Sequence, residues 1–183
     1  MLRTRVGYCG GDKAKPNYYG MGDHTEAVSV DYDPEVISYS ELLSYFWRGH
    51  RCELNNSNVQ YQNAIFYRND AQKKLAEISR DQWAKNQGIT IAQVATKIKP
   101  VKEFTYAEKY HQKYDLKGGI RSELDDLFPD AKSLADSTVA TRLNAYLGDG
   151  MKQKPAEFLR ELSEYGLSDE LEAKIRKRIK TYR

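Results

Sequence analysis

The chain has 183 residues, of which 40% are hydrophobic and 30% charged, enough for one domain with a packed core and a small appendage. Its net charge of +3 is too small to indicate a nucleic-acid-binding protein. No apolar stretch is long enough to span a membrane, no secretory signal follows Met1, and two cysteines cannot define a disulfide framework. We therefore expect a cytoplasmic protein that binds neither nucleic acid nor membrane. A mitochondrial address upstream of Met1 stays open.

The first third of the chain predicts two strands and a helix. Residues 3–8 alternate weakly and end at two glycines, as a strand running into a loop does, and residues 10–24 form an irregular connection. Residues 26–32 predict a second strand, because Val28, Val30 and Tyr32 share one face. Ser40 is the expected N-cap of a helix to about Arg48. The side chains expected on its buried side are Leu42, Leu43, Phe46 and Trp47.

Further elements follow in the middle of the chain. Residues 63–67 predict a short strand, and residues 70–86 predict a helix with Leu75, Ile78 and Trp83 near helical spacing. Residues 94–98 predict another strand, which Pro100 stops, and residues 106–114 predict a short helix. This order of elements is typical of an α+β fold.

The last third of the chain has a different pattern, with no convincing strand and predicted helices at 133–147, 155–165 and 168–182. In the last helix an apolar stripe lies beneath a basic face, and the stripe consists of Leu171, Ile175, Ile179 and Tyr182. We therefore predict a mixed, mainly antiparallel sheet flanked by helices over residues 1–117, followed by a helical C-terminal extension over residues 118–183.

Several short motifs follow one another in a distinctive order. They are T-R-V-G-Y-C-G-G (4–11), D-H-T-E-A-V-S-V-D-Y-D-P (23–34), F-W-R-G-H (46–50), Q-Y-Q-N-A-I-F-Y (60–67) and Y-A-E-K-Y-H-Q (106–112). Over about residues 3–117 the series resembles the catalytic domain of peptide methionine sulfoxide reductase A. The resemblance implies thiol-dependent reduction of methionine-S-sulfoxide in peptides and proteins, a repair of oxidative damage. It also implies thioredoxin or a similar dithiol as the electron donor, and no metal or bound organic cofactor.

Glu26 is the candidate proton donor. A sulfoxide oxygen is a poor leaving group until it is protonated, and the resemblance gives this role to the glutamate of the H-T-E motif. A carboxylic acid donates a proton near neutral pH when burial disfavours its charge, and the apolar run after Glu26 would bury it. Without the motif, a glutamate that opens a strand would be interpreted as solvated.

Tyr18 and Tyr61 are the candidate ligands of the sulfoxide oxygen. They lie in K-P-N-Y and Q-Y-Q-N, which match the motifs of the family's two oxygen-binding tyrosines. The alternative is that both are ordinary tyrosines, and Tyr19 competes with Tyr18 for the assignment. Five residues before Tyr61 the family usually has an aspartate, whereas this chain has Asn56, a candidate substrate-binding residue that supplies no negative charge.

The nucleophile is the departure from the family pattern. Its Gly-Cys-Phe-Trp-Gly motif lies upstream of T-R-V-G-Y and is absent from the printed sequence, so we expect an N-terminally incomplete member. Cys9 and Cys52 are possible redox thiols: Cys9 suits a small buried position, and Cys52 follows His50 and Arg51, a basic setting that favours a thiolate. A recycling role for them is favoured over primary attack.

The three histidines, His24, His50 and His111, are not spaced as zinc ligands, so no metal site is predicted. The alternative function is a noncatalytic family member that binds a sulfoxide or a protein partner.

Overall fold

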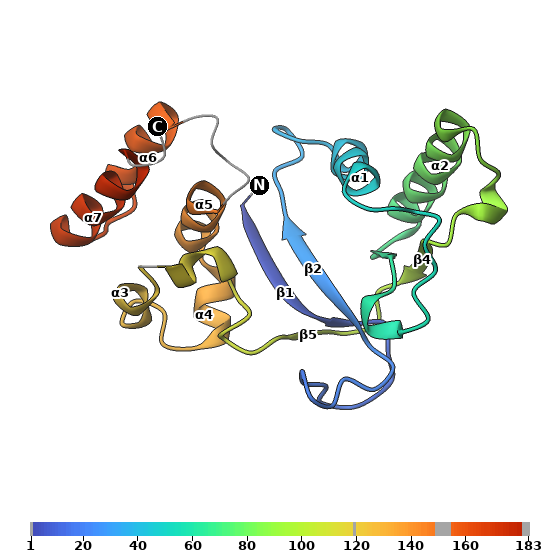
Figure 1. Cartoon of the computed structure of the whole chain (residues 1–183), viewed down its shortest axis with the longest axis horizontal. Helices are drawn as coiled ribbons and strands as arrows, with labels where there is room; N and C mark the ends of the chain where they lie inside the picture. The colour runs from blue at the N-terminus through green and yellow to red at the C-terminus, as the bar shows by residue number, and fades with distance from the viewer. Residues whose placement is uncertain (1, 119, 149–154, 181–183) are drawn as a thin grey trace. The chain divides into compact units, whose positions relative to one another are not determined.

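The computed structural model of the chain describes residues 2–118, 120–148 and 155–180 (Figure 1). Contacts within the chain divide it into two units. Unit 1 comprises Val6–Ala107, and unit 2 combines Leu2–Arg5 with the chain from Glu108 onward. No helix among the described residues is both long and apolar enough to cross a membrane.

A three-stranded sheet of order β2-β1-β5 is formed by β1 (Arg3–Cys9), β2 (Thr25–Asp31) and β5 (Phe104–Tyr106), and all of it except the start of β1, Arg3–Arg5, belongs to unit 1. β1 runs antiparallel to β5, with Gly7 opposite Tyr106 and Cys9 opposite Phe104. The predicted helix at residues 106–114 is wrong, because Tyr106 ends β5 and turns follow it as far as η3 (Tyr114–Gly118). Pairing with a distant strand outweighs the local helical pattern there.

A second sheet in unit 1 pairs β3 (Ala64–Tyr67) in parallel with β4 (Lys97–Pro100), with Ala64 opposite Lys97. The strand predicted at 94–98 therefore lies three residues too early, and Pro100 is the last residue of the strand rather than the residue that stops it. A parallel pair needs a long crossover, which α2 (Asp70–Gln87) and η2 (Ile91–Gln93) supply. Together the antiparallel and parallel pairs confirm the mixed α+β class.

α1 (Tyr39–Arg48) begins earlier than predicted, because Ser38 and not Ser40 is its N-cap. The Ser38 hydroxyl accepts from the Glu41 amide at 3.2 Å, and the Glu41 carboxylate accepts from the Ser38 amide at 2.9 Å, which completes a capping box. The predicted buried side is confirmed for Leu43 and Trp47.

α1 lies beside α2, and the two helices are in contact (Figure 1). The buried residues of α2 are Ala76 and Ala84, whereas Leu75 and Ile78 are exposed. Between the two helices the Trp47 indole N–H donates to the Ser79 hydroxyl at 2.9 Å, and the Trp47 ring stacks on Trp83 at a centroid distance of 6.4 Å. The core at this place consists of Leu43, Trp47, Cys52, Ile65 and Ala76.

From Arg121 onward, the secondary-structure elements among the described residues of unit 2 are all helices joined by short loops. Its elements are α3 (Arg121–Asp125), α4 (Ala131–Asp136), α5 (Thr138–Leu147), α6 (Pro155–Glu161), η4 (Leu162–Glu164) and α7 (Asp169–Lys180). The helix predicted at 133–147 is two helices, because Ser137 ends α4 and its hydroxyl caps α5 by accepting from the Ala140 amide at 3.0 Å.

Unit 2 has its own hydrophobic core. Its members are Leu116, Ile120, Leu124, Leu134, Ala140, Leu143, Leu147, Phe158, Leu162, Leu171 and Ile175. The apolar stripe predicted for the last helix is confirmed for Leu171 and Ile175, while the Ile179 side chain and Tyr182 lie outside what the structure describes. Residues from five of these helices thus share one core.

Candidate active site

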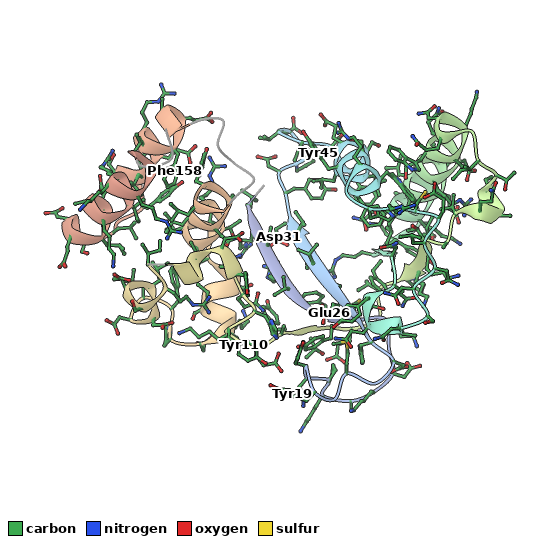
Figure 2. The ribbon with its side chains drawn as sticks, viewed as in Figure 1. Tyr19, Glu26, Asp31, Tyr45, Tyr110 and Phe158 are labelled. Atoms are coloured by element: carbon green, nitrogen blue, oxygen red, sulfur yellow. The ribbon has the colours of Figure 1, made fainter. Side chains whose placement is uncertain are left out.

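Three sequence-predicted residues meet at the start of β2. Tyr18 lies in the loop after β1, Glu26 is the second residue of β2, and Tyr61 ends η1 (Val59–Tyr61). One Nε2 atom joins two of them, because Gln60 donates to Glu26 Oε1 at 2.8 Å and to the Tyr61 hydroxyl oxygen at 2.9 Å. The Tyr61 and Tyr18 side chains also share a hydrogen bond. We call Tyr18, Glu26, Gln60 and Tyr61 the tyrosine–glutamate cluster. Figure 2 labels the Glu26 side chain on β2.

The cluster is open to solvent. Tyr18 is 39% exposed, Tyr61 is 50% exposed, and the Glu26 side chain is exposed as well. The expectation that the apolar run of β2 buries Glu26 is therefore wrong for these residues. Val28, which follows on the same face of the strand, is itself 62% exposed, so it cannot exclude water from its neighbour. The groups of the cluster are accessible to a ligand from outside.

The environment of Tyr61 keeps its hydroxyl protonated. Desolvation raises the pKa of Tyr61, and the nearby Glu26 carboxylate and Tyr18 raise it further, while the hydrogen bond from Gln60 opposes them. A phenolate next to a carboxylate is unfavourable, because two negative charges would then lie side by side. At neutral pH Tyr61 is thus a hydrogen-bond donor, as a ligand of a polarised oxygen must be.

A network of backbone contacts holds the loop that carries Tyr18. The Asp23 carboxylate accepts from the Asp12 amide at 2.9 and 3.0 Å and from the Lys13 amide at 3.1 Å, and these bonds lower the pKa of Asp23. The buried His24 ring contacts the Gly11 amide through Nδ1 at 3.3 Å and the Lys13 carbonyl through Nε2 at 2.8 Å. Since an amide only donates and a carbonyl only accepts, these contacts require the neutral ring with its proton on Nε2.

The start of β2 is also joined to η1. The Thr25 hydroxyl donates to the Val59 carbonyl at 3.0 Å, and the side-chain amide of Gln62 donates to the Thr25 hydroxyl at 2.5 Å. These bonds place Glu26 beside Gln60 and Tyr61, although 34 residues separate Glu26 from Gln60 in the sequence.

The two adjacent tyrosines differ in their surroundings. Tyr19 is 92% exposed and meets the edge of the Tyr18 ring at a centroid distance of 5.3 Å, whereas Tyr18 bonds to Tyr61. Of the two tyrosines, the cluster therefore contains Tyr18 and not its neighbour.

Asn56 does not join the cluster. Its side chain is exposed, and Oδ1 accepts from the Asn58 amide at 3.0 Å, which bends the loop before η1. Asn58 in turn caps η1 by accepting from the Gln60 amide at 3.0 Å. In this structure the Asn56 side chain shapes the segment that carries Gln60 and Tyr61.

Both cysteines are free, buried thiols outside the cluster. Burial raises the pKa of Cys9, and the amide of Gly10 and the charge of Arg68 oppose it only in part. Burial also raises the pKa of Cys52, and the Glu53 carboxylate raises it further. The predicted basic setting of Cys52 is therefore wrong: the neighbouring His50 ring bonds to the Phe46 carbonyl and the Thr96 hydroxyl instead.

Gln60 is the member of the cluster to which the sequence assigned no role. It stands in the Q-Y-Q-N motif beside Tyr61, but adjacency alone does not show that its amide turns toward a strand far away in the chain. Within the described ranges no three side chains of His, Cys, Asp or Glu come together as metal ligands.

Comparison with known proteins identifies relatives of the chain. The family model of peptide methionine sulfoxide reductase matches residues 1–136. A peptide methionine sulfoxide reductase of Drosophila melanogaster is 43% identical over 162 residues, covering 86% of this chain and 64% of the relative. Peptide methionine sulfoxide reductase A5 of Oryza sativa is 37% identical over 156 residues, covering 81% and 60%. The chain thus spans less than two thirds of the length of these relatives.

The fold leads to the same group of proteins. The crystal structure of Mxr1 from Saccharomyces cerevisiae in reduced form matches with a TM-score of 0.57 and 32% identity, over 63% of this chain and 70% of that one. Since the family model covers well over half of the sequence, motifs, fold and relatives agree. The chain belongs to the peptide methionine sulfoxide reductase family.

Proposed function

We propose that this protein reduces methionine-S-sulfoxide in peptides and proteins, with a dithiol as reductant. The observation that carries the proposal is the tyrosine–glutamate cluster, in which two hydroxyls and a carboxyl group from three separate segments meet at an exposed place. Such donors bind an oxygen on which negative charge develops. Glu26 is the proposed proton donor, and Tyr18 and Tyr61 are the proposed ligands of the sulfoxide oxygen.

The proposed reaction balances as follows. A thiolate attacks the sulfoxide sulfur and forms an S–S bond as the sulfoxide oxygen takes up a proton. The oxygen then leaves the former sulfoxide sulfur as hydroxide, and hydroxide attacks the thiol sulfur. This attack breaks the S–S bond and gives methionine and a sulfenic acid on the attacking thiol. A dithiol such as thioredoxin then reduces the sulfenic acid, which gives water and a disulfide. The electron pair that reduces the sulfoxide thus comes from the dithiol.

We assign the reaction to residues 1–117 and regard residues 118–183 as an extension with a separate core. The reducing cytoplasm is the proposed compartment, because both cysteines are free thiols. Asn56 is proposed to contact the substrate backbone from the loop before η1. Cys9 and Cys52 are proposed as recycling thiols, which requires that their burial be relieved during turnover.

The decisive experiment supplies the purified chain with dithiothreitol and a methionine-S-sulfoxide peptide and follows methionine formation by mass spectrometry. We expect Tyr61→Phe to lower kcat/KM by about 10²-fold, because one oxygen ligand is lost. Tyr19→Phe is the matched control and should act like the unaltered chain, since Tyr19 lies outside the cluster. Equal rates for Tyr61→Phe and Tyr19→Phe would contradict the proposed role of the cluster.

The second candidate is a noncatalytic protein that binds the sulfoxide, which the burial of both thiols favours. It predicts no turnover, together with sulfoxide-peptide binding that Tyr61→Phe weakens. Turnover that Cys52→Ser abolishes would exclude it.

A further inference from the structure

We propose that Gln60 is a positioning residue that directs the Tyr61 hydroxyl proton away from Glu26 and toward the bound oxygen. The inference rests on the proposed function of the cluster. It concerns a residue whose side chain contacts the proposed proton donor and one proposed oxygen ligand at once.

The orientation of the Gln60 amide follows from its two partners. The amide end that faces Glu26 and Tyr61 is the NH₂ group, because Nε2 is the atom that lies within hydrogen-bond distance of both. Its two N–H bonds then serve Glu26 Oε1 at 2.8 Å and the Tyr61 oxygen at 2.9 Å. Because Tyr61 accepts from Gln60, its one proton points elsewhere, to Tyr18 or to a ligand.

Without the amide the protons would be arranged differently. When Glu26 is without its proton, its carboxylate is a stronger acceptor than a neutral sulfoxide or hydroxyl, so in the absence of Gln60 it would compete for the Tyr61 hydroxyl proton. The sulfoxide oxygen would then lose the hydrogen bond from Tyr61, and Glu26 would accept a hydrogen bond from Tyr61 that does not serve the reaction. By occupying the space between them, Gln60 keeps these two functions separate.

The backbone around Gln60 supports this precision. The Gln60 amide N–H donates to Asn58 Oδ1 at 3.0 Å, which caps η1, and the Thr25 hydroxyl holds the Val59 carbonyl at 3.0 Å. Hydrogen bonds thus hold the backbone of Gln60 and of the preceding residue, Val59, before a ligand binds. A residue that positions another side chain needs such support.

The test combines a double-mutant cycle with a titration that needs no turnover. Gln60→Met keeps the volume of the side chain and removes both donors. We expect kcat/KM to fall about tenfold in the unaltered background but less than twofold in the Tyr61→Phe background, because Gln60 acts through the Tyr61 hydroxyl. Equal losses in the two backgrounds would overturn the proposal. Gln82→Met is the matched control, since Gln82 lies exposed on α2 and binds Asn86.

The second readout is the titration of Tyr61 by NMR of ¹³Cζ-labelled tyrosine, assigned with Tyr61→Phe. A hydrogen bond donated to the phenol oxygen stabilises the phenolate, so its loss in Gln60→Met should raise the pKa of Tyr61. An unchanged titration would overturn the proposal even in a chain that folds normally. If the unaltered chain shows no turnover and the titration still shifts, the proposed function fails while the assigned hydrogen bond stands.

Discussion

The Glu26 carboxylate influences its neighbour Tyr61 through its charge. Its carboxylate accepts from Gln60 and raises the pKa of Tyr61, although the Glu26 side chain is exposed. The charge therefore makes Tyr61 a more reliable donor before any substrate binds. In the proposed reaction, proton transfer from Glu26 and oxygen binding by Tyr61 would therefore be coupled.

Glu26→Gln separates these two effects. We expect kcat/KM to fall by about 10²- to 10⁴-fold, because the proton donor is lost. The pKa of Tyr61 should fall at the same time, because the nearby negative charge is gone. Methionine formation and the ¹³Cζ titration measure the two effects. Glu35→Gln, an exposed position outside the cluster, is the control, and full activity of Glu26→Gln would exclude Glu26 as the proton donor.

At the scale of elements, the two helices of unit 1 end in different ways. α1 ends at Gly49, whose φ of −87° any residue adopts, while α2 ends at Gly88 with a left-handed φ of 69°. The Gly88 amide bonds back to the carbonyl of Lys85 at 3.2 Å. Glycine is required by the backbone only at the second of these caps.

Gly88→Ala should therefore lower the free energy of unfolding by about 1 kcal/mol, measured by urea denaturation. No atom lies within 4 Å of the added Cβ, so the whole cost comes from the backbone conformation. Gly49→Ala is the matched control and should change stability little, because its Cβ meets only ordinary contacts at 3.4 and 3.5 Å. Equal losses for both variants would show that φ is not the cause.

At the scale of the whole molecule, each unit buries a separate core, and the start of β1 belongs to the helical one. The Nζ atom of the buried Lys113 has three N–H bonds and lies within hydrogen-bond distance of four acceptors. They are the Thr4 hydroxyl at 3.1 Å, the Ala135 carbonyl at 3.2 Å, the Thr141 hydroxyl at 2.7 Å and the Thr4 carbonyl. Residues 2–5 are thus joined to α4 and α5 within unit 2.

Lys113 makes the stability of unit 2 depend on pH. Burial and then the Arg5 guanidinium lower the pKa of Lys113 from its ordinary 10.5 to about 8, and the Asp136 carboxylate opposes them. Between these values the unfolded chain keeps a proton that the folded chain releases, so stability rises with pH across this window. We expect a rise of at most about 3 kcal/mol relative to Lys113→Met, measured by urea denaturation from pH 7 to 11.

The control for this prediction is Lys74→Met, an exposed position on α2, which should keep the full pH dependence of the unaltered chain. Identical pH profiles of the unaltered chain and Lys113→Met would show that the folded amine titrates at its ordinary value.

Local sequence patterns were sufficient to predict an element wherever residues close together in the chain determine its structure. The sequence by itself determined the family, the α+β class, both long strands and α2, because alternation, capping residues and Gly88 act within a few residues of one another. It also placed Tyr18, Glu26 and Tyr61 on a common list through their motifs. The roles of these residues stay predictions.

Only the tertiary structure decided the features that depend on distant partners. Residues 104–106 became β5 because β1 lies beside them, and Ala76 became a buried residue of α2 because it packs in one cluster with Leu43 and Trp47 of α1. The exposure of Glu26, the burial of Cys52 and the two bonds of Gln60 follow from which segments meet. The solvent exposure and the hydrogen-bond partners of a side chain depend on contacts between segments that are distant in the sequence. A short stretch of sequence contains only one of the two segments, so it cannot predict them.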